Sequence, residues 1–304
     1  MFGNRVLFNS ICLGFFIVSI KEMKTINVSR FFRDEFVYGG HLLSLGAVGI
    51  VASVMMLNNF YFDIKFITSV YLIAQTVYFY NRIKEYESDN ISNPNRNMHL
   101  SKYRNYFLAI IIFYIIVTVA ILISFNDVVS SSAGLLLLFS GIMYSEYFKN
   151  KTRNYIGFKN YYVAFFWSFL VLFTALYYHA SLNATILIFF IFVLLRWLIN
   201  TTFFDIKDIE SDKQNNLKTI PVYFGKKRTL DMLSVINLIS FFPLFIGIYF
   251  NLLPVYFASL IVFYFYSLFY IMKARTEGSS IRNLSYIMVD GEYVFWPIIL
   301  LLFK

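Results

Sequence analysis

Nine apolar runs of membrane-crossing length constrain the fold of this 304-residue chain more than any other feature of its sequence. A helix of about 20 residues spans the hydrocarbon core of a bilayer, which is about 30 Å thick. The composition agrees, because 59% of the residues are hydrophobic and 14% are charged, against about 25% charged in soluble domains. We therefore predict an all-α fold, a polytopic membrane helical bundle of about nine transmembrane helices. The runs lie near 38–57, 61–80, 105–124, 129–147, 161–178, 184–204, 230–249, 253–272 and 284–303.

The lysines and arginines predict the orientation of these helices. All of the 26 except Lys65, Arg196 and Lys304 lie before the first run or in alternate loops after it. Positively charged loops stay on the cytoplasmic side of a membrane. We therefore expect an integral multi-pass protein of the cell membrane, with its N-terminus and both polar motifs described below facing the cytoplasm. The net charge of +9 is then a topology signal and not a nucleic-acid footprint.

The residues before the first run form a segment of their own. We interpret 1–37 as a cytoplasmic or interfacial segment that precedes a single transmembrane domain over 38–304. The stretch 6–20 is apolar but short for a span, so it could be an interfacial helix, an extra span or a signal-like segment. We favour the interfacial helix, because a tenth span would place Arg5 on the opposite face. The single cysteine, Cys12, excludes an internal disulfide and a cysteine-based zinc site.

A cluster of carboxylates follows the sixth run directly. Asp205, Asp208 and Asp212 are spaced by three and four residues, which places them on one face if the helix continues. Arg196 and Asn200 extend the same stripe back into the membrane. Carboxylates this close repel by roughly 4 kcal/mol per pair at 4 Å and an effective dielectric of about 20. A cation must compensate, and Mg²⁺ is the ion expected for oxygen ligands; the alternative is an acidic helix end solvated at the interface.

A second polar stripe ends the second run. Asn81, Glu85 and Asp89 follow one another at steps of four residues. One such stripe arises easily by chance, whereas two stripes, each after a membrane-length run, favour a shared site. If the two helices pack together, their carboxylates can share one or more Mg²⁺ ions, whose other positions water or substrate phosphate normally fills. The spacing alone predicts a site for a metal and an anion.

Both stretches resemble the signature motifs of the UbiA superfamily of intramembrane prenyltransferases. NRIKEYESD followed by NISNPNR is similar to the family pattern NxxxDxxxD followed by a segment like INRPDRP, and DIKDIESDKQNNLKTIPVYFG is similar to DxxDxxGDRxxGxxTLPVxxG. The positions in register are Asn81, Asp89, Pro94, Arg96, Asp205, Asp208, Asp212, Lys213, Thr219, Pro221 and Gly225. The chain departs from the family pattern at Glu85, Tyr86, Ser211 and Asn216. These departures bear on the acceptor and the fine geometry more than on metal–diphosphate chemistry.

The resemblance implies an enzyme, a Mg²⁺-dependent prenyltransferase. It would transfer an isoprenoid group from an allylic prenyl diphosphate to a lipophilic acceptor through an allylic carbocation, with release of pyrophosphate. The acceptor could be an aromatic quinone precursor, a tetrapyrrole or a glycerol-phosphate lipid, and the sequence selects none of them; prenyl chain length and oligomeric state also stay open. The alternatives are a membrane terpene cyclase of the same superfamily and a non-catalytic cation-binding membrane protein.

The resemblance also implies roles for individual residues. Glu85, Asp89, Asp208 and Asp212 would be catalytic, and together with Asn81 and Asp205 they would hold the metal. The expected diphosphate-binding residues are Asn81, Arg96, Lys102, Lys149, Lys159, Arg196, Asn200, Lys213 and Lys218. Each cation could equally be an ordinary positive-inside residue, and each asparagine a helix–helix hydrogen bond. Arg196, deep in the membrane, could instead pair with Asp290 or Glu292.

Overall fold

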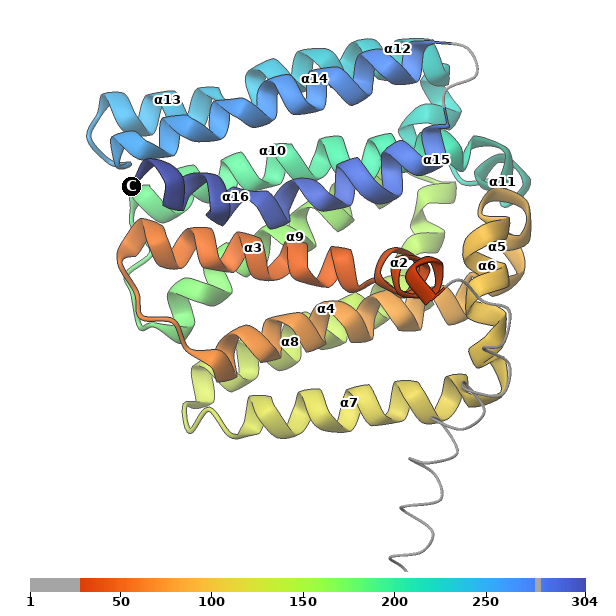
Figure 1. The fold of residues 1–304 in the computed structure, drawn as a ribbon, viewed down its shortest axis with the longest axis horizontal. Helices are drawn as coiled ribbons and strands as arrows, with labels where there is room; N and C mark the ends of the chain where they lie inside the picture. The colour runs from red at the N-terminus through yellow and green to blue at the C-terminus, as the bar shows by residue number, and fades with distance from the viewer. Residues whose placement is uncertain (1–27, 277–279) are drawn as a thin grey trace, which may run out of the picture.

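The computed structural model describes residues 28–276 and 280–304, and every regular element within them is helical. The helix expected at 6–20 lies outside the described residues. The long helices lie side by side in one bundle (Figure 1). They are α3 (His41–Asn58), α4 (Ile64–Lys84), α7 (Phe107–Ile123), α8 (Val128–Glu146), α9 (Phe158–Tyr177), α10 (Ala184–Lys207), α12 (Ile220–Ile239), α13 (Phe242–Tyr249), α14 (Val262–Arg275) and α16 (Asp290–Phe303). The predicted all-α fold is confirmed.

Short helices connect the long ones, and most of them gather at one end of the bundle. They are α2 (Val28–Tyr38), α5 (Tyr86–Ser92), α6 (Pro94–Leu100), η1 (Ser101–Tyr106), η2 (Phe148–Arg153), α11 (Ile209–Gln214), η3 (Val255–Ile261), α15 (Ile281–Asn283) and η4 (Leu284–Val289). Helices α2, α5, α6 and α11 lie at the right-hand end in Figure 1. We call these four helices the polar cap.

Eight helical stretches within the described residues are long and apolar enough to cross a membrane. They correspond to eight of the nine predicted runs. The remaining run, the one expected at 61–80, forms the 21-residue α4, which packs against α3, α7 and α8. Helix α4 carries Gln75, Asn81 and Arg82, among other polar residues. The chain is an integral multi-pass membrane protein.

The centre of the bundle is formed by α3, α9, α10 and α16. Trp197 stacks between Trp167 and Tyr293, with ring centroids 4.8 and 4.7 Å apart. Helices α3 and α16 approach so closely at Gly49 that a Cβ atom there would lie 2.1 Å from the carbonyl oxygen of Tyr293. Only glycine therefore permits this contact without a shift of one helix. Stacked aromatic rings and this close helix contact thus form the centre of the bundle.

A carboxylate of helix α2, that of Glu35, joins this helix to the segments beside it. Glu35 lies 2.8 Å from His99 Nε2 and accepts a hydrogen bond from the Tyr103 hydroxyl at 2.7 Å. Burial opposes ionisation of Glu35, but hydrogen bonds from His41, His99 and Tyr103 more than offset it and lower its pKa. The chain then turns into α3 at Gly40, whose φ of 88° favours glycine.

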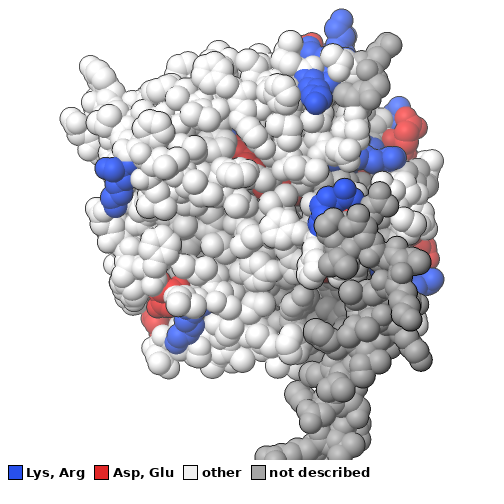
Figure 2. Space-filling model, in the orientation of Figure 1, with Lys and Arg blue, Asp and Glu red and all other residues white. Residues whose placement is uncertain are grey.

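The surface separates apolar from charged regions. Figure 2 shows a largely uncharged surface along the bundle, with most of the visible lysines and arginines toward the end that carries the polar cap. The loops predicted to be positive therefore lie together at this end. That this end faces the cytoplasm stays a prediction from the positive-inside rule.

Candidate functional site

Neither polar motif continues its helix as predicted. Helix α4 ends one residue before Glu85, and α10 ends one residue before Asp208. A new helix follows each break directly: its first backbone hydrogen bond runs from Asp89 N to Glu85 O at 2.9 Å in α5 and from Asp212 N to Asp208 O at 2.8 Å in α11. The breaks bring α5 and α11 into contact with each other at the end of the bundle.

The carboxylates of the first motif are neutralised by basic side chains. Arg96 donates through Nη2 to Asp89 Oδ1 at 2.7 Å and through Nε to Asp89 Oδ2 at 3.1 Å. Glu85 pairs with Arg82 Nη2 at 2.6 Å and with Lys149 Nζ. Burial opposes ionisation of Glu85, but Arg82 and Lys149 more than offset it and lower its pKa. Glu85 is therefore a carboxylate at neutral pH.

The second motif is neutralised in the same way. Lys159 Nζ lies 2.6 Å from Asp205 Oδ1 and 3.7 Å from Asp212 Oδ2. Lys207 Nζ lies 2.7 Å from Asp208 Oδ2. Burial raises the pKa of Asp212, and Asp205 and Asp208 add to this while Lys159 opposes it. For Asp208 burial is outweighed by Lys207 and Lys159, which lower its pKa to about 2. Asp212 thus holds a proton more readily than Asp208, and a cation beside it would favour its ionised form.

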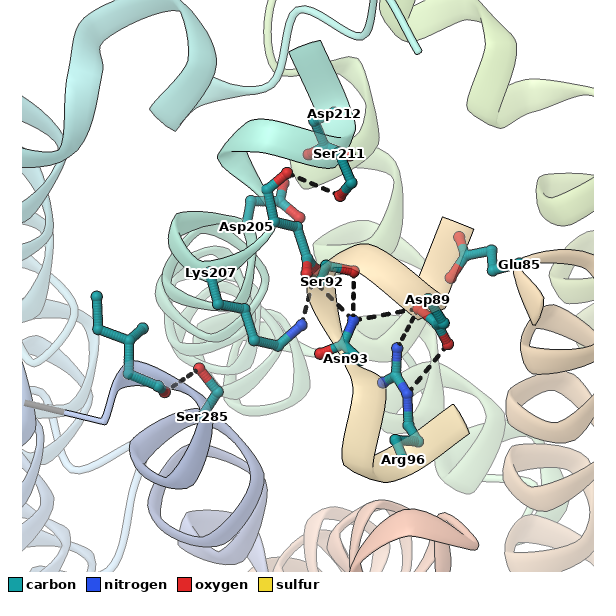
Figure 3. Close-up of polar contacts among 12 residues, drawn as sticks. Glu85, Asp89, Ser92, Asn93, Arg96, Asp205, Lys207, Ser211, Asp212 and Ser285 are labelled. Atoms are coloured by element: carbon teal, nitrogen blue, oxygen red, sulfur yellow. Dashed lines mark hydrogen bonds and ion pairs between the residues drawn. The ribbon is translucent and has the colours of Figure 1, made fainter. Parts of the chain in front are cut away.

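Asn93 connects the two motifs. Its Nδ2 lies 3.1 Å from Asp89 Oδ1 and 3.2 Å from Asp208 Oδ1. The Tyr286 hydroxyl donates to Asn93 Oδ1. In Figure 3, Asn93 lies between Asp89 and the side chains of the second motif. This amide therefore bridges Asp89 of the first motif and Asp208 of the second.

A cavity of about 170 Å³ lies beneath these groups, inside the bundle. Charged and amide side chains line one part of it, and apolar side chains line the other. The polar part is formed by Asn81, Arg82, Glu85, Arg96, Lys159, Asp205, Lys207 and Asp208, and the apolar part includes Leu43, Val77, Phe166, Trp167, Trp197 and Phe204. We call the first part the roof and the second the floor. Such a cavity suits a ligand with an anionic head and a hydrophobic tail.

The carboxylates do not form a ready-made metal cluster. Among the described residues, no three acidic, histidine or cysteine side chains stand close enough together to hold a metal ion. The basic side chains that pair with them and offset part of their repulsion are Arg82, Arg96, Lys149, Lys159 and Lys207. The donors nevertheless fit Mg²⁺ chemically, because carboxylate and amide oxygens are its preferred ligands. Of the six predicted metal ligands, Asn81, Glu85, Asp205 and Asp208 line the cavity, and Asp89 and Asp212 contact its lining residues.

The predicted diphosphate-binding cations fall into two groups. Arg96 and Lys159 line the cavity, and Lys149 lies at its rim against Glu85. The others are not at the site. Lys102, Lys213 and Lys218 are exposed and do not line the cavity. We leave these three lysines out of the site proposed below.

Arg196 occupies a different environment from the one predicted. It is 1% exposed and does not line the cavity. Its Nη2 and Nε lie 2.6 and 2.9 Å from Glu292 Oε1, and its Nη1 donates to Asn237 Oδ1 at 2.6 Å. This geometry corrects the expected diphosphate role, because protein groups already occupy the guanidinium. Arg196 instead forms the ion pair with Glu292 that was the predicted alternative.

The two predicted asparagines have separate surroundings. Asn81 lines the cavity and accepts a hydrogen bond from Ser145 Oγ at 3.0 Å. Asn200 also lines the cavity, but its Nδ2 donates to the carbonyl oxygen of Val289 at 3.3 Å and to Asp290 Oδ1 at 3.4 Å. Asn200 thus forms the helix–helix hydrogen bond that was the alternative to a ligand contact.

Four residues of the site escaped the sequence analysis. Arg82 and Lys207 were counted as topology residues, although each adjoins a motif residue in the chain. Asn93 and Tyr286 carry no signal in their spacing, because their contact joins segments 193 residues apart. Adjacency to a motif was the available clue for the two cations.

The fold and the site together define a class: a helical membrane protein with acidic and basic side chains gathered over an apolar cavity. The sequence model of the UbiA prenyltransferase family matches residues 42–289. The chain therefore belongs to the UbiA prenyltransferase family and is a transferase of prenyl groups. A comparison with curated protein sequences finds no match.

Solved structures share this fold. The apo structure of a UbiA homolog from Aeropyrum pernix K1 has a TM-score of 0.64 at 15% identity, covering 86% of this chain and 95% of that chain. A UbiA homolog from Archaeoglobus fulgidus bound to DMAPP and Mg²⁺ has a TM-score of 0.60 at 15% identity, covering 88% of this chain and 98% of that chain. A digeranylgeranylglyceryl phosphate synthase has a TM-score of 0.54 at 15% identity, covering 90% and 97%. At this identity the similarity establishes the fold.

Proposed function

We propose that this chain transfers a prenyl group from an allylic prenyl diphosphate to a lipophilic acceptor in a Mg²⁺-dependent reaction. The observation that carries the proposal is one cavity with a charged roof and an aromatic floor. The diphosphate would bind in the roof and the prenyl chain on the floor. A structure of similar fold, the Archaeoglobus fulgidus homolog, was solved with DMAPP and Mg²⁺. We place the polar cap on the cytoplasmic side, where positively charged loops are retained.

The charges of the roof explain why a metal should accompany the diphosphate. Five carboxylates pair with five basic side chains at the roof and directly beside it, so these paired charges nearly cancel without ligand. A diphosphate alone would bring uncompensated negative charge into a buried site, at a large cost in free energy. If Asp205 and Asp208 held Mg²⁺, Lys159 and Lys207, with which they now pair, would be available to the phosphate oxygens. The residues that would hold it are Asn81, Glu85, Asp89, Asp205, Asp208 and Asp212.

The side chains of the cavity would then promote ionisation of the substrate. Bound Mg²⁺ supplies Lewis-acid stabilisation of the leaving pyrophosphate. Arg96, Lys159 and Lys207 line the roof and would donate to diphosphate oxygens, stabilising the charge that develops as the allylic C–O bond breaks. The apolar side chains of the floor, among them Val77, Phe166 and Trp167, would exclude water from the carbocation. The acceptor then captures that cation.

The test is pyrophosphate release by the purified protein in detergent, with allylic diphosphates of several chain lengths. We expect release to require Mg²⁺ and to fall by roughly 10²-fold or more in Asp208→Asn, because a charge aimed at the reacting group is lost. Asp231→Asn is the matched control, since Asp231 is exposed and pairs with Arg275 away from the cavity. Release of a cyclised terpenoid without acceptor would favour a terpene cyclase. No release by the folded protein would favour a non-catalytic member of the family.

A further inference from the structure

The cavity contains one carboxylate that the diphosphate chemistry does not use. Asp290 begins α16, lines the cavity and is 8% exposed. An ionisable side chain within a membrane-spanning helix is costly, and such residues usually have a function. A role is therefore expected for Asp290.

Asp290 differs from its neighbour Glu292 in its partners. Glu292 is held by Arg196 at 2.6 Å and by Ser267 Oγ at 3.1 Å. Among the described residues, Asp290 forms no ion pair, and its side chain has one long hydrogen bond, from Asn200 Nδ2 at 3.4 Å. Buried acids with a structural role are normally paired with a cation. The same helix thus carries a structural acid and, two residues before it, an acid that stands open to the cavity.

Asp290 lies where the roof meets the floor, because the roof residues Lys207, Arg96 and Arg82 act electrostatically on its carboxylate while its hydrogen-bond partner lies deeper. Its partner Asn200 lies eight residues before Asp208, which is about 12 Å deeper along α10. The cavity walls also include Leu43, Trp197 and Phe204, which are apolar. Asp290 therefore faces the region where the prenyl carbocation and the acceptor would meet, and Asn200 holds its carboxylate there.

We infer that Asp290 is the base that takes the proton of a hydroxyl group on the acceptor. The inference rests on the proposed function. As the C–O bond of the prenyl diphosphate breaks, its electron pair leaves with pyrophosphate. A lone pair of the hydroxyl oxygen forms the new bond to the allylic carbon, and the hydroxyl proton moves to the carboxylate of Asp290. In a phenol the new bond can form instead at the neighbouring ring carbon. That carbon then loses its hydrogen as a proton, and the ring oxygen gains a proton, which restores the hydroxyl group. The acceptor is therefore a phenol or an alcohol, because both classes carry a hydroxyl proton that a base can take.

The experiment separates ionisation from capture. We compare the wild type with Asp290→Asn and Asp290→Glu, each supplied with a radiolabelled allylic diphosphate and Mg²⁺. One acceptor probe is added to each reaction. The probes are a dodecylphenol, a dodecyl glycerol ether, and the fully methylated form of either. In Asp290→Asn we expect pyrophosphate release within about threefold of wild type, and prenylated product lower by roughly 10²-fold or more, the usual contribution of a general base. Prenyl alcohol from water capture replaces the product. Asp290→Glu restores part of the transfer, and the methylated probes give no product.

A matched variant distinguishes this from a structural role. Glu292→Gln also removes a buried carboxylate from α16, and it should lower thermal stability, with pyrophosphate release and transfer falling in equal proportion as less of the protein stays folded. The same parallel loss in Asp290→Asn would overturn the inference, as would transfer at the wild-type rate. Product from the methylated probes, or release without capture of either hydroxyl probe, would overturn the assignment of the acceptor. Transfer to one hydroxyl probe alone identifies the acceptor as a phenol or an alcohol. Absence of Mg²⁺-dependent release in wild type would overturn the proposed function itself.

Discussion

The ion pair between Arg196 and Glu292 should contribute to stability and not to substrate binding. Arg196 Nη2 lies 2.6 Å from Glu292 Oε1, and the two side chains are 0% and 2% exposed. Solvent therefore does not screen this pair. Glu292→Gln leaves a guanidinium charge in the bundle without its counterion, and Arg196→Met leaves a carboxylate without one.

The burial sets the magnitude of the effect. Removing one partner of a buried ion pair costs about 3–5 kcal/mol of unfolding free energy. We expect Glu292→Gln near the lower value, because glutamine keeps an acceptor oxygen and Asn237 still accepts from Arg196 Nη1. Arg196→Met should be near the upper value. The double variant Arg196→Met/Glu292→Gln should lose much less than the sum, because no charge is then buried alone.

The assay is SDS-induced unfolding in mixed micelles, followed by circular dichroism. Arg275→Met is the control, since its pair with Asp231 is 30% and 54% exposed and should contribute less than about 1 kcal/mol. The KM for the allylic diphosphate, measured on the folded double variant, should stay near the wild-type value. A loss of unfolding free energy in the double variant equal to the sum of the two single losses would refute the pairing. A stable double variant with a KM raised tenfold or more, as expected on losing a charge-assisted hydrogen bond, would restore Arg196 to the diphosphate site.

Three further predictions follow from particular contacts. Lys207→Met should lower pyrophosphate release by roughly 10- to 100-fold, the effect of losing one hydrogen bond from a charged group. Lys213 is exposed, so Lys213→Met should leave the release unchanged. Equal effects of the two variants would contradict the assignment of Lys207 to the cavity. Gly49→Ala should destabilise the bundle by about 1–3 kcal/mol in the same SDS titration, while Gly291→Ala, where a Cβ would meet nothing closer than 3.9 Å, should not. Glu35 has a lowered pKa, so its contribution to stability is present above the unfolded value of about 4.3 and is lost as pH falls further. Thermal unfolding of wild type should therefore show an acid-induced decrease that Glu35→Gln flattens, and identical pH profiles would contradict this.

The carboxylates of the site were predictable and their partners were not. The spacing of Asp205, Asp208 and Asp212 indicated a shared face, and all three lie at or beside one cavity. The breaks before Glu85 and Asp208 were missed, because neither residue interrupts a helix by its own propensity. The lysine and arginine partners of these carboxylates were not predicted, because each pairing depends on how the helices pack. A pattern of acids shows that compensation is needed but not which group supplies it.

The sequence by itself determined the membrane bundle, the end of it that carries the charges, and the family, because hydrophobicity and motif spacing are properties of short segments. Only the tertiary structure decided which charges meet. Arg196 and Glu292 are 96 residues apart in the chain, and Asn200 and Asp290 are 90 apart. Such pairs depend on which helices pack together and at what depth, and that is settled by the whole core, including the close contact at Gly49. Two acids separated by one residue thus acquire different surroundings: Glu292 is paired with Arg196, and Asp290 faces the cavity.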